Sequence, residues 1–459
     1  MLKNEGIHSF FILIREIIRT GQFNVLNFHL KKSSMVHTRY LMENYDYQKM
    51  KLKTISDKVS VIIPTNTTSS NLQPLLTALK NQEGIEDLEI VLINSGNHDL
   101  STLSDSKIKV IKIEPQDFQH GRTRNFGVEK SSGKYLMLTV DDALPASNFL
   151  LYKMVKTLID DPEIGAVTAK QIQKQNANMG YTISMFNHYQ NMGINKDKIQ
   201  WTDDYEKLTQ SEKSFLARID DVCVGYRRDI FLKFKYKEIN FGEDMELGIR
   251  LAKSGMKIAR IYSDGVFHSH DRTSSYHLKR YYVGIMVQVK LFGYGKNEFI
   301  KLDINSLSDF SQQVLPLYNS LCLTIDELRT NPQSYKIDKM YKTIQKKMKK
   351  YYGNSTKPIH ADKSLDEIFT IIFNSRNIKP TKSYEKNPLT WRFNHFNLWK
   401  LQYQIQKIYP NLKTVNNEVI DILSEQFGQF VGSYLAQFYF NKPNDKDLKS
   451  VHEFLMKGV

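Results

Sequence analysis

A short β-branched run opens the ordered pattern of this chain: residues 59–64 read VSVIIP. A run of this kind that stops at a proline is typical of a buried strand ending in a loop. Two further apolar runs follow, LEIVLI at residues 88–93 and YLMLTV at residues 135–140, and leucines at helical spacing occupy residues 71–79. Strands that alternate with helices predict an α/β domain with a mostly parallel sheet.

Polar side chains come directly after each of these runs. Pro64 and Thr65 end the first run, Asn94 follows the second, and Asp141 and Asp142 follow the third. Ligands of open parallel sheets bind at the carboxyl ends of the strands, so these residues mark the candidate site. No glycine-rich dinucleotide-binding loop follows the first strand and no P-loop motif occurs in the sequence, which disfavours both of those nucleotide-binding classes.

The chain has 459 residues, with 64 Lys+Arg against 49 Asp+Glu and a formal charge of +15. This length accommodates two or three domains. Only two cysteines occur, in no paired spacing, which argues against a disulfide framework or a cysteine-rich zinc module and favours a reducing compartment. The basic excess leaves three partners open: nucleic acid, an anionic membrane surface, or a phosphorylated substrate.

We expect three segments: an N-terminal helical extension at residues 1–57, the α/β domain at residues 58–290, and a C-terminal helical domain at residues 291–459. In the first segment, residues 7–18 carry an apolar stripe at helical spacing, which predicts an amphipathic helix docked on its own protein or on a membrane surface. No segment approaches the ~20 apolar residues that span a bilayer. The last segment shows apolar stripes at helical spacing and no recognisable catalytic motif.

Two acidic pairs carry candidate chemistry. Asp141 and Asp142 repel each other unless a cation neutralises them, and Mg²⁺ or Mn²⁺ takes carboxylate oxygens; a solvated turn or helix cap is the alternative. Glu243 and Asp244 lie in the stretch FGEDMELGIRL at residues 241–251, near the start of an expected helix. There they either favour the helix dipole or supply a general base.

A histidine pair and a basic stretch add to these. His268 and His270 stand at positions i and i+2, so on a strand they would point to the same side and could ligate a metal. Surface or core histidines are the alternative. The stretch FQHGRTRNFG at residues 118–127 contains arginines that could bind phosphate through fork-like hydrogen bonds, or else forms a solvated basic loop.

The order and spacing of these motifs resemble the family-2 inverting glycosyltransferases with a GT-A fold, over about residues 58–290. The matching stretches are VIIPT at 61–65, LKNQ at 79–82, GRTRNFG at 121–127, SGKY at 132–135, YRR at 226–228 and GED at 242–244. The stretches FQHGRTRNFG, LTVDDALP at 138–145 and HSH at 268–270 look most like the rhamnosyltransferase branch.

The resemblance implies substrate-binding roles residue by residue. Thr65 and the backbone beside Pro64 would line the nucleotide-base pocket. Asn94 stands where the family commonly has an aspartate that contacts the base, and its amide could still read a uracil or thymine edge. Arg124 would contact the diphosphate or the ribose region, and Asn125 lies beside it in the same stretch.

The resemblance also implies a metal site for Mn²⁺ or Mg²⁺. Asp142 matches the second aspartate of the family's metal-binding Asp-x-Asp motif. The first position of that motif falls on Val140, so Asp141 would substitute for it in part. His270, or alternatively His268, would supply a further metal ligand.

The implied reaction is sugar transfer with inversion. Asp244 matches the general base that deprotonates the acceptor hydroxyl, and Glu243 lies beside it. The donor would be a UDP- or dTDP-linked hexose or deoxyhexose, and the acceptor a hydroxyl of a glycan, lipid-linked or not, in bacterial surface polysaccharide synthesis. The alternatives are a nucleotidyltransferase that makes a nucleotide sugar and a non-catalytic basic scaffold.

Basic residues outside the catalytic half bear on location. Lysines and arginines gather at residues 31–53 and 346–350, and each could contribute about 1 kcal/mol near an anionic leaflet. We therefore expect a cytoplasmic enzyme held peripherally at the inner face of the cell membrane. Nucleic acid becomes the least favoured partner, and a homo-oligomer stays open.

Overall fold

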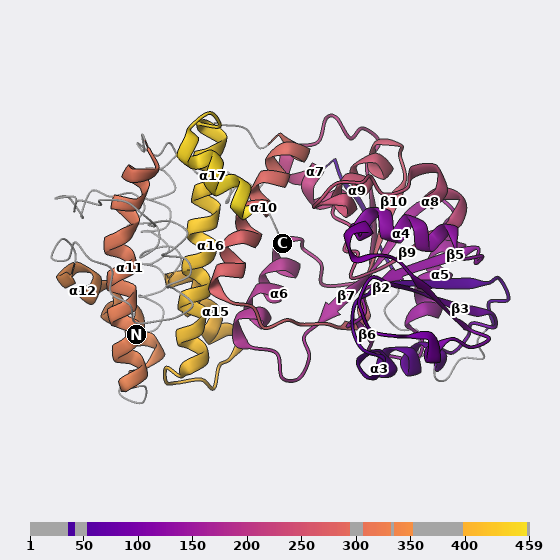
Figure 1. Cartoon of the computed structure of the whole chain (residues 1–459), viewed down its shortest axis with the longest axis horizontal. Helices are drawn as coiled ribbons and strands as arrows, with labels where there is room; N and C mark the ends of the chain where they lie inside the picture. Colours follow the sequence, from indigo (N-terminus) through magenta and orange to yellow (C-terminus); the bar gives the residue numbers. More distant parts are fainter. Residues whose placement is uncertain (1–34, 42–52, 294–305, 332–334, 352–397, 457–459) are drawn as a thin grey trace.

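The computed structural model describes residues 35–41, 53–293, 306–331, 335–351 and 398–456. Figure 1 shows an α/β half on one side of the molecule and a helical half on the other, with helices α6 (Met179–Asn191) and α10 (Ser274–Phe292) between them. The expected combination of an α/β domain with a C-terminal helical part is therefore confirmed.

A single mixed sheet organises the α/β half. Its strands are β1 (His37–Tyr40), β2 (Val59–Thr65), β3 (Leu88–Asn94), β4 (Ile108–Lys112), β5 (Tyr135–Thr139), β6 (Leu144–Pro145), β7 (Ile164–Ile172), β8 (Lys198–Trp201), β9 (Cys223–Arg227) and β10 (Lys257–Phe267). They run in the order β1-β8-β10-β7-β9-β5-β2-β3-β4, and β6 pairs with β10. The two longest ladders, β7–β10 and β2–β3, are parallel, whereas β9 runs antiparallel to both of its neighbours.

Helices cover both faces of this sheet. They are α3 (Ser69–Lys80), α4 (His120–Glu129), α5 (Leu150–Asp160), α7 (Gln210–Ala217), α8 (Arg228–Phe234) and α9 (Glu243–Lys253). Every residue of β2 is buried, with Val61 and Ile63 in one core cluster and Ile62 in the cluster on the opposite face. A strand covered on both faces is continuously apolar because neither set of alternating side chains meets water.

The first described residues differ from the expected N-terminal helical extension. His37–Tyr40 form strand β1, because their backbone pairs antiparallel with β8 at the edge of the sheet. The predicted amphipathic helix at residues 7–18 lies outside the described residues. Within the described part of the chain, no helix has the length and apolar character needed to cross a membrane.

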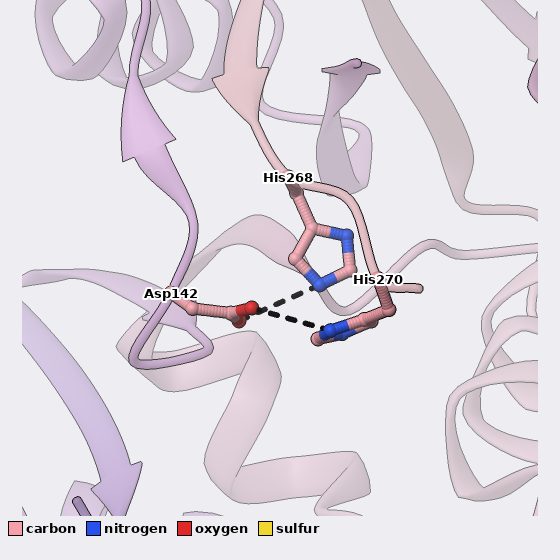
Figure 2. Close-up of side chains that lie close together, drawn as sticks. All are labelled: Asp142, His268 and His270. Carbon is pink, nitrogen blue, oxygen red and sulfur yellow. Dashed lines mark ion pairs between the residues drawn. The ribbon is translucent and has the colours of Figure 1, made fainter. Parts of the chain in front are cut away.

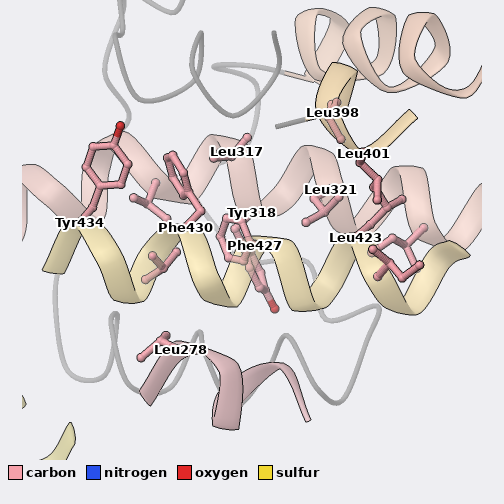
Figure 3. Close-up of a cluster of buried hydrophobic side chains, with 14 of the residues drawn as sticks. Leu278, Leu317, Tyr318, Leu321, Leu398, Leu401, Leu423, Phe427, Phe430 and Tyr434 are labelled. Carbon is pink, nitrogen blue, oxygen red and sulfur yellow. The ribbon is translucent and has the colours of Figure 1, made fainter. Parts of the chain in front are cut away.

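The helical half packs around one long helix. Its elements besides α10 are α11 (Leu307–Thr330), α12 (Ile337–Tyr351), α15 (Leu398–Ile408), α16 (Asn417–Asn441) and α17 (Lys446–Leu455). In Figure 3, α16 lies between α11 and α10 and presents Phe427 and Phe430 to the shared core. The rings of Phe427 and Tyr318 of α11 lie with centroids 6.2 Å apart. The apolar stripes expected in the last segment lie on helices α12, α15 and α16, whose buried residues include Met340, Leu401 and Val431.

Two helices from the middle of the chain share this core. Met179 of α6 and Leu278 of α10 belong to the same buried cluster as the C-terminal helices. Gly432 of α16 lies so close to α10 that an added Cβ would fall 2.1 Å from the backbone oxygen of Leu278. The division at residue 290 stays a prediction, but the helical core itself draws on residues before that point.

Candidate active site

One carboxylate and two imidazoles meet at the carboxyl edge of the sheet. Asp142 follows β5, and His268 and His270 follow β10. Their ligand atoms all lie within 4.8 Å of one another, and Figure 2 shows both rings facing the carboxylate. His268 Nε2 lies 3.5 Å from Asp142 Oδ1, and His270 Nδ1 lies 3.6 Å from Asp142 Oδ2. The structure therefore brings together all three predicted metal ligands.

The two histidines converge for a reason other than the expected one. Strand β10 ends at Phe267, so His268 and His270 lie in the loop before α10 and not on a strand. Their rings meet edge to face, with centroids 4.5 Å apart. The turn of this loop, and not the alternation of a strand, points both imidazoles at Asp142.

Burial prepares these imidazoles to act as ligands. His268 is 7% exposed, and burial lowers its pKa to about 4. Burial also lowers the pKa of His270. Both rings are therefore neutral near pH 7, which is the state in which imidazole ligates a metal. A carboxylate and two neutral imidazoles within this span fit a divalent cation.

Asp141 faces away from this cluster toward the first strand. Thr65, the last residue of β2, donates its hydroxyl to Asp141 Oδ2 at 2.8 Å. Burial is the main cause of the raised pKa of Asp141. Strand β2 also pairs with β5, where Ile62 is the register partner of Leu138, so Thr65 and Asp141 lie at neighbouring strand ends. On the other side of β2, Pro64 pairs with Ile93 of β3.

Asn94 is buried at the end of β3, where its amide organises the following loop. Its Nδ2 donates to the His98 carbonyl at 2.8 Å, and its Oδ1 accepts from the Gly96 amide at 2.9 Å. These bonds hold the loop after β3 in a tight turn of the Asx type. Contact of Asn94 with a nucleotide base stays a prediction.

A second cluster, which we term the acid cluster, comprises Arg124, Asp221, Glu243 and Asp244. Helix α9 begins at Glu243, after Gly242 with φ of +79°. A side chain at Gly242 would be strained in this conformation, and its Cβ would also fall 2.6 Å from Val287. Arg124 Nη1 lies 3.1 Å from Glu243 Oε1 and 3.0 Å from Asp221 Oδ2.

Burial and the crowding of carboxyl groups raise the pKa values of Glu243 and Asp244 in the acid cluster. Glu243 is 6% exposed, and its burial together with the nearby charge of Asp221 raises its pKa to about 7. Burial and the charge of Asp221 also raise the pKa of the half-buried Asp244 well above its usual value. Carboxyl groups whose pKa lies near the working pH are suited to general acid–base chemistry.

Two predicted substrate-binding residues make internal contacts. Arg124 is only 2% exposed and is held by the carboxylates of the acid cluster. Asn125 donates through Nδ2 to the Tyr236 carbonyl at 2.9 Å and accepts from the Tyr236 amide at 3.0 Å. These contacts fix α4 against the segment before α9, and a role for either residue in substrate binding stays a prediction.

The sequence reasoning missed four residues of this site. Asp220 and Asp221 stand just before β9, and they repeat the pattern of two aspartates beside an apolar run that singled out Asp141 and Asp142. Gln171 lies near the carboxyl end of β7, and Lys174 Nζ lies 3.8 Å from Asp142 Oδ2. Neither of these two had a local sequence signal, because strand order alone brings them to the site.

Residues 60–234 match the family model for glycosyl transferase family 2. This segment is a glycosyl transferase family 2 domain. The glycosyltransferase is 29% identical over 231 residues to the O-antigen chain rhamnosyltransferase RfbN of Salmonella typhimurium, covering 49% of this chain and 70% of that protein. It is 26% identical over 229 residues to the O-antigen chain rhamnosyltransferase WbaN of Salmonella anatum, covering 49% and 70%. The expected enzyme class is confirmed.

Two solved structures are similar to parts of this chain. The mannosyltransferase PcManGT of Pyrobaculum calidifontis, in complex with GDP-Man and Mn²⁺, is 14% identical with a TM-score of 0.38, covering 53% of this chain and 68% of that one. TarS 1–349 of S. aureus in complex with UDP is 16% identical with a TM-score of 0.36, covering 64% and 89%. Likeness at this level does not bear on the function of the family 2 glycosyltransferase described here.

Proposed function

We propose that this glycosyltransferase moves a deoxyhexose, specifically rhamnose, from a nucleotide-diphosphate donor to a hydroxyl of a growing surface glycan, with inversion and with a divalent metal. The observation that carries the metal-dependent part is the convergence of Asp142, His268 and His270 at the edge of the sheet. The sugar is supported by the similarity of this chain to RfbN and WbaN, both O-antigen chain rhamnosyltransferases.

The ligand set favours Mn²⁺ over Mg²⁺. Magnesium prefers oxygen ligands, whereas two of the three donors here, His268 and His270, offer imidazole nitrogen. A divalent ion at this position would supply positive charge beside the leaving diphosphate. Asp142 would hold that ion with the two histidines, and Asp141 would remain bound to Thr65 next to the nucleotide.

The acid cluster supplies the base. In the proposed step the acceptor oxygen bonds to the anomeric carbon while the bond from that carbon to the diphosphate oxygen breaks. The acceptor proton passes to Asp244, where burial and the neighbouring carboxylates raise the pKa and so favour uptake of that proton. Arg124 and Glu243 would fix the position of the first turn of α9, on which Asp244 stands.

The donor base would bind where β2 and β3 end. Thr65 and Asn94 are register partners in the parallel pair, so their side chains mark adjacent positions on the edge of the sheet. Both are buried. A dTDP or UDP base stacked over this edge would place its diphosphate toward Asp142.

We also propose that the acceptor is lipid-linked and that the enzyme works at the inner face of the membrane. Lys346 and Lys347 on α12 belong to the basic excess outside the catalytic half. Co-sedimentation with anionic and neutral liposomes tests this location. Stronger binding to anionic vesicles supports it, and equal binding to both kinds contradicts it.

The donor and the metal can be tested together. Thermal-shift measurements with dTDP-rhamnose, UDP-glucose and GDP-mannose, each with Mn²⁺, Mg²⁺ or EDTA, should give the largest stabilisation for dTDP-rhamnose with Mn²⁺. A radiolabelled donor and lipid-linked acceptors would then report transfer. Stabilisation by another nucleotide sugar would overturn the rhamnose assignment, and stabilisation that EDTA does not reduce would overturn the metal dependence.

A further inference from the structure

We propose that Gln171 is a positioning residue that holds the His268 ring with Nε2 toward the metal cluster and ties that ring to the acid cluster. This inference rests on the proposed metal-dependent function. It concerns a residue that has no motif around it and is placed only by strand pairing: Gln171 is the register partner of Val266, two residues before His268, in the parallel β7–β10 ladder.

The amide of Gln171 has a fixed orientation. Its Nε2 lies 2.5 Å from Asp220 Oδ2, and a carboxylate oxygen can only accept there. The opposite end of the amide, the carbonyl oxygen Oε1, therefore faces His268 Nδ1 at 2.9 Å. The backbone amide of Gln171 also donates to the Tyr189 hydroxyl at 2.6 Å, which secures the strand at this residue.

This orientation selects one tautomer of His268. An amide oxygen carries no proton, so the proton of the 2.9 Å contact must sit on His268 Nδ1. The lone pair is then on Nε2, the atom that lies 3.5 Å from Asp142 Oδ1. The Tyr181 hydroxyl donates to the same Gln171 oxygen at 3.1 Å and lies farther, at 3.4 Å, from His268 Nδ1. Gln171 is therefore the nearer and better placed acceptor for that proton.

The Nε2 end of the Gln171 amide connects, through Asp220, to the residues around the proposed general base Asp244. Asp220, which accepts from Gln171, directly precedes Asp221, and Asp221 shares Arg124 with Glu243. A continuous run of side chains and one peptide bond thus joins the metal-facing imidazole to the first turn of α9. Outer partners of this kind orient metal-bound histidines, and their loss typically lowers metal affinity about 10–100-fold.

The first test reads the tautomer in the metal-free full-length protein. With ring-¹⁵N-labelled histidine, NMR should show His268 protonated at Nδ1, with the signal assigned by its loss in His268→Gln. Gln171→Met, which keeps the length of the side chain and removes its polar atoms, should abolish this preference. Tyr181→Phe should preserve it. A tautomer that is unchanged in Gln171→Met, or that switches in Tyr181→Phe, would overturn the inference.

The second test measures Mn²⁺ affinity by calorimetric titration without any donor. Gln171→Met should bind Mn²⁺ about 10–100-fold more weakly than wild type. Gln173→Ala is the matched control, since Gln173 is an exposed glutamine two residues along, and it should bind as wild type does. Equal Mn²⁺ binding by Gln171→Met and wild type would contradict the positioning role. Failure of wild type itself to bind Mn²⁺, with the Nδ1 tautomer intact, would instead remove the metal from the proposed function.

Gln171→Ala provides a second route if Gln171→Met does not fold. Circular dichroism and the midpoint of thermal unfolding should confirm that each variant is folded before the NMR and Mn²⁺-binding measurements. The expected tautomer change and loss of Mn²⁺ affinity are the same for both variants, because both remove the acceptor oxygen. A folded Gln171→Ala that retains both properties would overturn the inference.

Discussion

The two halves of this molecule use buried polar groups in opposite ways. In the α/β half, the loops after β5 and β10 bring Asp142 and His268 together, and helices α4 and α9 bring Arg124 and Glu243 to Asp221 just before β9. In the helical half, α16 buries apolar side chains such as Phe427, and its neighbours meet it through contacts such as that of Tyr318. An open strand edge gathers side chains from several loops at one place, whereas side-by-side helices fill that space with their own apolar faces.

One carboxyl group of α16 departs from this contrast. Glu425 is 7% exposed, and its Oε2 lies 3.7 Å from Nε2 of His277 on α10. Burial, with smaller effects of the charges of Asp421 and Asp271, raises the pKa of Glu425 to about 8. The group is therefore mostly protonated near pH 7, which lets the helical core hold it without an isolated charge.

The largest expected effect comes from removing the proposed base. Asp244→Asn should keep donor binding and reduce transfer about 10²–10⁴-fold, because only proton abstraction is lost. Steady-state transfer and calorimetric donor binding separate the two effects. Glu246→Gln on the same helix is the control, since Glu246 is bonded to Arg250 and should leave turnover near wild type. Near-normal turnover of Asp244→Asn would show that the base is another residue.

The pH profile of transfer should follow the acid cluster. A base must be unprotonated, and the pKa of Glu243 is raised to about 7 while that of Asp244 is raised in the same direction. The transfer rate should therefore fall as pH is lowered, because Asp244 takes up a proton and Glu243 does so at about pH 7. A profile that is flat from pH 6 to pH 8, measured with chemistry rate-limiting, would be inconsistent with this cluster as the base.

The next largest effect should come from removing a proposed metal ligand. Asp142→Asn should weaken Mn²⁺ binding by about 100-fold, since loss of even an outer partner costs about 10–100-fold. Calorimetry with dTDP and with UDP, in the presence and absence of Mn²⁺, measures this change. If Asp142→Asn leaves the Mn²⁺ dependence of nucleotide binding unchanged, the metal site lies elsewhere.

Substitutions in the helical half should change the stability of the fold and not the catalytic step. Gly432→Ala should destabilise the fold by about 1–3 kcal/mol, because its Cβ would meet the Leu278 oxygen. Gly284→Ala on α10 is the matched control: its Cβ meets nothing within 4 Å, and the change should stabilise the helix by about 0.5–1 kcal/mol. Urea unfolding measures both. Equal effects of the two variants would mean that α16 and α10 are not packed this closely.

The smallest effect should be a change in how stability depends on pH. The pKa of Glu425 is raised from its ordinary value of 4.5 to about 8, so its contribution to stability is present below about pH 4.5 and is lost as pH rises through about 8. Glu425→Gln cannot ionise and should therefore gain stability relative to wild type between pH 5 and pH 9. Thermal unfolding at pH 5 and at pH 9 tests this prediction. A difference in stability between Glu425→Gln and wild type that is the same at both pH values would contradict the raised pKa.

Local sequence patterns were sufficient to predict part of this fold and part of the candidate site. The buried strand at 59–63 was predictable from its continuous β-branched run, although β2 continues through Pro64 to Thr65 and does not stop at the proline. The residue pattern singled out Asp142 after a strand and the pair His268 and His270, and the family resemblance joined them in one metal site. That both histidines lie in the loop after β10 was not predictable from their i, i+2 spacing. Gln171 and Asp221 were not, because their contacts depend on β9 running antiparallel between β7 and β5. The burial of Arg124 among carboxylates likewise depends on which helix packs against α4.

Helix α10 limits how this protein could be recombined with its relatives. It begins at Ser274, and only Asp271, Arg272 and Thr273 separate it from His270, yet its far side is enclosed by α16. A chimera joined anywhere along α10 would combine a catalytic loop from one parent with a helix fitted to the other. Viable crossovers are therefore expected before β10 or after α16, so that α10 and α16 come from the same parent. A functional chimera should therefore exchange α10, α16 and the two histidines before α10 together.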